Sequence, residues 1–384
     1  MKFLVPTLIL FLSVIASAEA PALLQASLKG LLVVELDNGK IAGTASQMNA
    51  TAVKNGGSQL EIVFNQEVGE DMRTATKEVS KFIHVRHDGK LPEGYRIELA
   101  FADKYSPKDG PSAAVASALL VDSMIVGNEL ADDFAVTGDM NADGHVQPVG
   151  GVPAKISGAQ RKGCKIVAVP SSNESAVSDA YIVDGLAALK KIQIFSIADF
   201  EEARAISSKE RDENLAKAIS EFSKIQEVLA RDEKFISNSK VIEKLREVVT
   251  ISPNHLSAKY LLLHAVGQAP RSLTLAGSIE AINKADTALA GMLSSGSFTI
   301  SRGNSDLLFK FESEMIRLRP LLDKRTIDFS DSYIELAEFV RDNRDRKIFT
   351  PQLQRELDGA VSKISYEQSA LLGDADVREE LMLE

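Results

Sequence analysis

The chain has 384 residues and 54 acidic against 44 basic side chains, a net charge of −10, and its length predicts two or three domains. Its 45% apolar and 26% charged residues are typical of a globular protein, which excludes a disordered chain and a protein of many membrane spans. The acidic balance argues against nucleic acid as a partner, and the single cysteine, Cys164, excludes an intramolecular disulfide, a Cys-based zinc site and an iron–sulfur cluster.

The chain begins with the pattern of a secretory signal peptide. Met1-Lys2 precedes an apolar run over residues 3–15, and the small residues Ala16-Ser17-Ala18 form a cleavage site. We expect residues 1–18 to be removed and the protein to be exported, either to a periplasm or to the medium. An uncleaved anchor is the alternative, although the run is shorter than the ~20 residues of a spanning helix and contains Pro6. We expect no stable membrane insertion after cleavage.

Residues 28–197 alternate strand-sized apolar segments with helical stretches. Strands are expected at 31–36, 60–64, 95–100, 134–136, 146–149, 166–169 and 192–195. The first ends at Asp37-Asn38-Gly39, a hairpin signal. Helices are expected at about 67–83, 112–126, 152–162 and 174–190. This mixture predicts an α+β domain, a mixed sheet covered by helices.

Residues 198–384 have helical periodicity and predict an all-α C-terminal domain. Thr350-Pro351 is a cap and first-turn signal for a helix to about Leu372. Residues 251–263 resemble part of a tetratricopeptide helical hairpin, but no period of ~34 residues surrounds them.

The most informative segment is Pro107-Lys108-Asp109-Gly110-Pro111-Ser112-Ala113-Ala114. A turn at 109–111 places Ser112 at the start of an apolar helix, where free N–H groups and the helix dipole can stabilise an oxyanion. Taken alone, Ser112 is more often a helix cap than a nucleophile.

Further segments follow in a fixed order: Val136-Thr137-Gly138-Asp139, then Pro148-Val149-Gly150-Gly151, then Lys155 and the strand before Pro170. With this series, residues 28–197 resemble the proteolytic domain of the Lon protease family. Lys155 lies 43 residues after Ser112 (155 − 112), which is the spacing of that family's nucleophile and lysine.

The resemblance implies a serine–lysine dyad of Ser112 and Lys155. It also implies supporting roles for Thr137, which orients the lysine amine, and for Asp109 and Gly110, which shape the nucleophile turn. A lysine acts as a base only when burial lowers its pKa from about 10.4. Asp139 replaces the family's usual glutamate and Ala114 its usual glycine, which leaves the dyad intact but puts the substrate preference in doubt.

Other candidate sites have weaker support. His84 and His87 share a polar stretch that is typical of an exposed turn, and with Asp88 they could chelate a metal only weakly. His145 is a candidate substrate contact, and Cys164 is expected to be a small core residue. We expect neither a metal nor a cofactor.

The expected function is therefore ATP-independent serine endopeptidase activity on peptides or unfolded proteins, because no G-x-x-x-x-G-K-[ST] loop occurs in the chain or fits before residue 28. The alternative is a non-catalytic peptide-binding or scaffold protein built on the same domain. Self-cleavage near residue 200 is a third hypothesis. The family's ring assemblies imply a homo-oligomer.

Overall fold

The computed structural model describes residues 20–35, 41–102, 109–293, 302–343 and 350–383. The expected signal peptide, the Asp37-Asn38-Gly39 turn and residues 107 and 108 lie outside these ranges. Within them, no helix combines the length and apolarity needed to cross a membrane.

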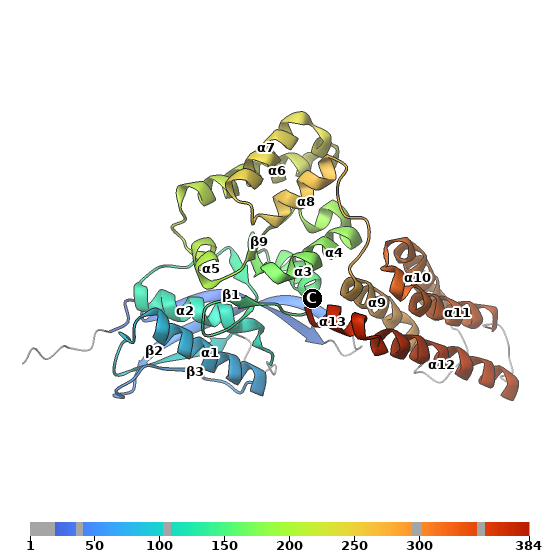
Figure 1. Cartoon of the computed structure of the whole chain (residues 1–384), viewed down its shortest axis with the longest axis horizontal. Coiled ribbons are helices and arrows are strands. Elements are labelled where there is room, and N and C mark those ends of the chain that lie inside the picture. The colour runs from blue at the N-terminus through green and yellow to red at the C-terminus, as the bar shows by residue number, and fades with distance from the viewer. Residues whose placement is uncertain (1–19, 36–40, 103–108, 294–301, 344–349, 384) are drawn as a thin grey trace, which may run out of the picture.

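A seven-stranded mixed sheet forms the centre of the N-terminal half (Figure 1). The strands are β1 (Gln25–Glu35), β2 (Ile41–Lys54), β3 (Glu61–Phe64), β4 (Tyr95–Phe101), β5 (Phe134–Val136), β8 (Ile166–Pro170) and β9 (Gln193–Ile197), with β6 (Asp139–Met140) and β7 (Val146–Gln147) in a separate hairpin. Their order is β3-β4-β2-β1-β5-β8-β9, in which β2 is antiparallel to β1 and β4 and all other neighbours are parallel. The α+β class is therefore confirmed.

Thirteen α-helices occur in the described residues. They are α1 (Glu70–Arg86), α2 (Ala114–Val126), α3 (Val152–Arg161), α4 (Glu174–Asp184), α5 (Phe200–Ser207), α6 (Glu213–Arg231), α7 (Ser239–Ile251), α8 (Leu256–Ala265), α9 (Leu275–Leu293), α10 (Arg302–Leu318), α11 (Ile327–Asn343), α12 (Pro351–Gly373) and α13 (Ala375–Leu383). Thr350 caps α12 by accepting a hydrogen bond from the N–H of Leu353, so this predicted helix start is confirmed.

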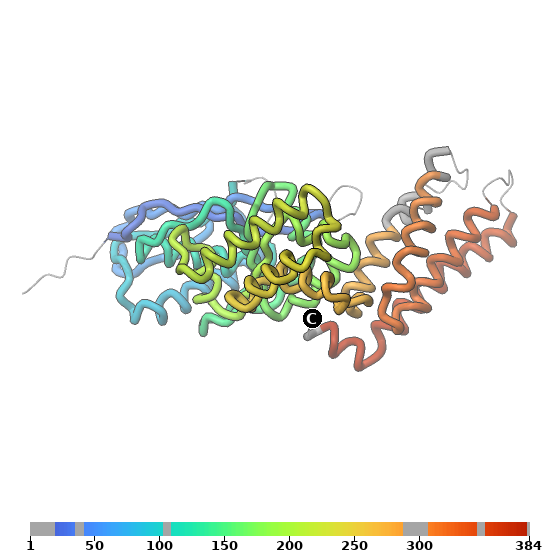
Figure 2. The backbone as a smooth tube through the Cα atoms, turned by 90° about the horizontal axis from the view of Figure 1, so that it is seen from above, coloured from blue at the N-terminus to red at the C-terminus, as the bar shows by residue number. Residues whose placement is uncertain are grey.

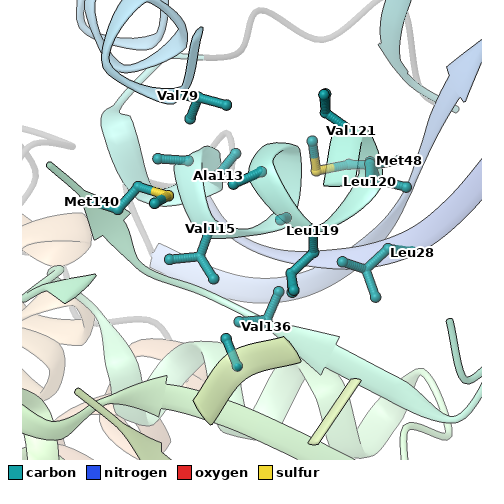
Figure 3. Close-up of a cluster of buried hydrophobic side chains, with 14 of the residues drawn as sticks. Leu28, Met48, Val79, Ala113, Val115, Leu119, Leu120, Val121, Val136 and Met140 are labelled. Carbon is teal, nitrogen blue, oxygen red and sulfur yellow. The ribbon is translucent and has the colours of Figure 1, made fainter. Parts of the chain in front are cut away.

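The sheet buries both of its faces, as the alternation along β1 illustrates. Leu28 and Leu32 pack into the core beneath α1, α2 and α5, whereas Leu31 packs into the core shared with α3, α4 and α6 to α8. Helix α2 is apolar on all sides and buried from Ala114 to Met124, so it lies in the middle of the first core (Figure 3). Such a helix is rigid because close packing surrounds it.

The C-terminal helices fall into two groups. Helices α5 to α8 share cores with the sheet, whereas α9 to α12 form a third core of their own. The latter group extends to one side as an arm, and α13 returns from it toward α3 and α9 (Figures 1 and 2). We call α9 to α13 the helical arm.

Two sequence-based expectations need correction. The sequence missed the 14-residue strand β2, in which glycine and small polar residues weaken the apolar alternation. The helix expected over 174–190 ends at Asp184, because Gly185 adopts a φ of 64° and a short 3-10 helix (Gly185–Ala188) follows.

Candidate active site

Ser112 lies in a one-turn 3-10 helix, Pro111–Ala113, that leads directly into α2. Its backbone carbonyl accepts a hydrogen bond from the Gly138 N–H at 3.0 Å, which ties the serine to the end of β5. Ala113 and Val115 anchor this segment in the core against Val136 (Figure 3). The serine is half-buried on a rigid base.

Asp109 and Gly110 form the turn before the serine, and each has a visible structural role. Gly110 has a φ of 95°, a conformation that favours glycine. The Asp109 carboxylate accepts hydrogen bonds from the N–H of Gly110 at 2.8 Å and, more weakly, from the N–H of Met72 at 3.4 Å in the first turn of α1. A Cβ at Gly69 would lie 1.9 Å from the Asp109 carboxyl carbon. Gly69 thus leaves room for the carboxylate that links this turn to α1.

Lys155 is on α3, which packs unusually closely on β2. A Cβ at Gly43 would lie 1.8 Å from the Ala154 carbonyl oxygen, and one at Gly158 would lie 2.4 Å from the Gly43 carbonyl oxygen. Arg161 also donates a hydrogen bond to that Gly43 oxygen at 2.8 Å. Two glycines therefore bring the helix backbone against the strand and set the position of Lys155. Sequence reasoning missed both, although a glycine inside a strand is a signal of close backbone approach.

Thr137 connects the lysine to the serine segment. The Lys155 Nζ donates a hydrogen bond to Thr137 Oγ1 at 3.1 Å, and Thr137 Oγ1 donates to the Ser112 carbonyl oxygen at 3.3 Å. Thr137 is fully buried and Lys155 is only 3% exposed. The hydrogen bonds of the described residues include none between Ser112 Oγ and Lys155 Nζ. The two predicted residues are thus brought together through Thr137.

Burial changes the chemistry of the lysine amine. Desolvation lowers the pKa of Lys155 to about 8, and no carboxylate raises it again. A substantial fraction of the amine is therefore neutral near pH 8. A neutral buried amine is what a lysine base requires.

The backbone at the start of α2 offers the Ser112 N–H as a donor for an oxyanion. The N–H of Gly110 is paired with Asp109, that of Ala114 with the Pro111 carbonyl, and that of Val115 with the Gly138 carbonyl. The N–H of Ser112 has no backbone partner among the described residues. Oxyanion sites in acyl-transfer enzymes are built from such backbone donors.

The structure places the remaining candidates away from this cluster. His84 is exposed in the last turn of α1, whereas His87 lies in the turn that follows the helix, half-buried against Asp122 and 3.0 Å from its carboxylate. The turn prediction holds for residues 87–89 but not for His84, because the helix continues through Arg86. His145 is largely exposed beside Asp143, and Cys164 is buried in the core. Across the described ranges, no three His, Cys, Asp or Glu residues are grouped to hold a metal.

Comparison with known proteins identifies the domain. Residues 36–202 match the family model described as the Lon protease (S16) C-terminal proteolytic domain. This part of the chain is therefore similar to the proteolytic domain of Lon proteases. This match agrees with the resemblance to the Lon proteolytic domain that the order of motifs around Ser112 and Lys155 predicts.

Individual relatives give the same result. An archaeal Lon protease from Thermococcus kodakarensis is 29% identical over 189 residues, which cover 48% of this chain and 28% of the relative. Lon protease 1 of Herpetosiphon aurantiacus is 34% identical over 117 residues, 28% of this chain and 14% of the relative. A Lon protease of Desulforamulus reducens is 27% identical over 145 residues, 36% of this chain and 18% of the relative. The chain thus spans under a third of the length of each of these relatives.

Proposed function

We propose that this protein is a serine endopeptidase in which Ser112 is the nucleophile and Lys155 the general base. The observation that carries the proposal is the buried Lys155 amine, with a pKa lowered to about 8 and a hydrogen bond to Thr137, which itself bonds to the Ser112 carbonyl. Asp109 and Gly110 support the site by fixing the turn before the serine.

In the proposed reaction, neutral Lys155 takes the proton of the Ser112 hydroxyl as its oxygen attacks the peptide carbonyl. The Ser112 side chain turns toward the amine when substrate binds, because catalytic hydrogen bonds often tighten only in the substrate complex. The Ser112 N–H stabilises the oxyanion of the tetrahedral intermediate. Lys155 then gives its proton to the leaving amine, which leaves an acyl-enzyme. A water molecule loses a proton to Lys155 and attacks the ester carbonyl, and Lys155 returns that proton to the Ser112 oxygen as the ester bond breaks, which releases the acid product and restores both residues.

We further propose that the chain works without ATP, on peptides or unfolded proteins, outside the cytoplasm. Two sequence features support this: no nucleotide-binding G-x-x-x-x-G-K-[ST] loop occurs in the chain, and its first 18 residues have the pattern of a secretory signal. Without ATP-driven unfolding, the scissile segment has to reach Ser112 in an extended form.

The test is hydrolysis of casein and of a quenched fluorogenic peptide library without nucleotide. The wild-type protein is expected to cleave both, and Ser112→Ala and Lys155→Ala are expected to lose at least a thousandfold in kcat/KM, because nucleophile and base act as a unit. Ser157→Ala, at a half-buried position of α3 that hydrogen-bonds to Arg161, is the matched control and is expected to keep its activity.

Cleavage by Ser112→Ala at the wild-type rate would overturn the assignment of the nucleophile. If the wild-type protein neither cleaves the library nor reacts with a fluorophosphonate probe, the domain is a peptide-binding scaffold instead.

A further inference from the structure

A cavity of about 390 Å³ lies where the proteolytic domain meets the helical arm. We call it the junction cavity. One wall is formed by residues 148–153, which comprise the loop before α3 and the first two residues of that helix. The start of α4 forms another wall. The arm closes it with residues from the beginning of α9 and with Leu381 of α13. Figure 1 shows the end of α13 close to α3 and α9.

The cavity reaches the first turn of α3, the helix that carries Lys155. Val152 and Pro153, in the first turn of α3, line it, and Lys155 follows in the same helix. Asn173 holds the loop in place by accepting a hydrogen bond from the Val149 N–H at 2.8 Å. In acyl transfer the leaving amine has to reach Lys155 to be protonated. Substrate residues after the scissile bond therefore come close to the start of α3 and to this cavity.

The walls combine apolar surface with negative charge. Val149, Val152, Pro153 and Leu381 supply hydrocarbon contacts. Asp179 is only 4% exposed, and its carboxylate accepts hydrogen bonds from the Thr274 N–H at 3.0 Å and the Thr274 hydroxyl at 2.7 Å.

Glu280 lies at the solvent-exposed rim of the cavity. Its pKa is raised, chiefly because part of its surroundings is desolvated; Lys284 opposes this shift and Asp179 adds to it. A cation entering the cavity would relieve the repulsion between the two carboxylates. A long apolar stem that ends in a positive charge matches this combination of walls.

We propose that the junction cavity is a substrate subsite that takes a lysine or arginine side chain from the leaving-group side of the scissile bond. The inference rests on the proposed peptidase function and gives the helical arm a role in it: Glu280 on α9 determines the preference for a basic residue.

The test uses N-acetylated fluorogenic peptides, so that the side chain is the only cation introduced. Lysine is compared with norleucine, and arginine with citrulline, at each of the first positions after the scissile bond. At one position the wild-type protein is expected to prefer the charged residue about tenfold in kcat/KM, since hydrogen bonds to charged groups contribute about 1.5–3 kcal/mol. Glu280→Gln is expected to abolish the preference and Glu280→Lys to reverse it. Glu243→Gln, which removes an exposed carboxylate on α7, is the control.

A binding experiment separates this proposal from the proposed catalysis. Fluorescence polarisation with the Ser112→Ala protein measures affinity for the same peptides without turnover. Glu280→Gln in that background is expected to weaken binding of the lysine peptide about tenfold and to leave the norleucine peptide unchanged. If Glu280→Gln changes the affinity for the lysine and norleucine peptides equally, or changes neither, the proposed subsite is wrong. This conclusion holds whether or not the wild-type protein cleaves peptides.

Discussion

At the scale of single residues, burial of the Lys155 amine decides what the site can do. Because Lys155 has to be neutral to take the serine proton, kcat/KM is expected to rise with pH and to level off above the pKa of about 8 that burial gives this amine. The measurement is kcat/KM for a peptide without ionisable side chains between pH 6 and 10. A profile that still rises with an apparent pKa near 10.4, the value of a solvated lysine, would contradict the role of burial.

Thr137 provides a second test because its hydroxyl both accepts from Lys155 and donates to the Ser112 carbonyl. Thr137→Val removes both hydrogen bonds at nearly constant volume, and we expect kcat to fall about 10–100-fold with little change in KM. Thr137→Ser keeps the hydroxyl and should restore most of the activity. If valine and serine at this position behave alike, the threonine only fills space.

At the scale of elements, the contact between α3 and β2 sets the position of Lys155, the proposed base. In Gly43→Ala the added methyl group would overlap the Ala154 carbonyl, so α3 has to move away from the strand. We expect at least a hundredfold loss of kcat/KM, because a displacement of about 1 Å costs roughly that much. Peptide hydrolysis and circular dichroism measured on the same sample separate this loss from unfolding.

Gly359→Ala is the matched control for that substitution. Gly359 is in α12 of the helical arm, and a Cβ there would meet no atom within 4 Å. We expect full activity and a small gain in stability, because alanine favours a helix over glycine by about 1 kcal/mol. A Gly43→Ala protein as active as this control would show that the close contact does not position Lys155.

The same elements show what the sequence could and could not predict. The sequence predicts a buried helix over 112–126, and α2, which begins at Ala114 and ends at Val126, has nearly those bounds. The resemblance of the motifs to the Lon proteolytic domain predicts Ser112, Thr137 and Lys155 as a site. Strand β2 was not predicted because its own side chains show only a weak strand pattern. It forms because its backbone pairs with β1 on one side and β4 on the other. The roles of Gly43, Gly69 and Gly158 depend on backbone approaches between segments far apart in the chain, which one-dimensional patterns do not encode.

At the scale of the whole molecule, helices α5 to α8 pack with the sheet and belong to its cores, unlike α9 to α12. The outer edge of β9 is covered by the start of α8, where the Ser196 N–H donates to the Asn254 carbonyl and the Ile194 N–H to the Ser257 hydroxyl. Covering an edge strand in this way protects it from pairing with other chains. It also joins the sheet to α6, α7 and α8 in one core.

His255 lies at the contact between β9 and α8 and makes the stability of the protein depend on pH. Its ring is fully buried between Phe195 and Phe222, its Nε2 donates to Gln193 Oε1 at 3.1 Å, and its Nδ1 accepts from the Ala258 N–H at 3.2 Å. These partners require the neutral ring, and burial lowers the pKa of His255 to about 3. In the unfolded chain the pKa is about 6.5.

Between these two values the unfolded state binds one proton more than the folded state, so stability is lost as the pH falls below about 6.5. The free energy of unfolding is expected to drop by about 2 kcal/mol between pH 7.5 and 5 from this residue alone, at about 1.4 kcal/mol per pH unit. Urea unfolding followed by circular dichroism measures the drop, and His255→Gln, which cannot titrate, should lose this part of it. Histidine NMR signals provide an independent readout, because the His255 ring should stay neutral down to pH 5 in the folded protein. The prediction is wrong if the free energy of unfolding depends on pH in the same way in the wild type and in His255→Gln, or if the His255 ring becomes charged near pH 6.5. Either result would show that the contact between β9 and α8 accommodates the imidazolium.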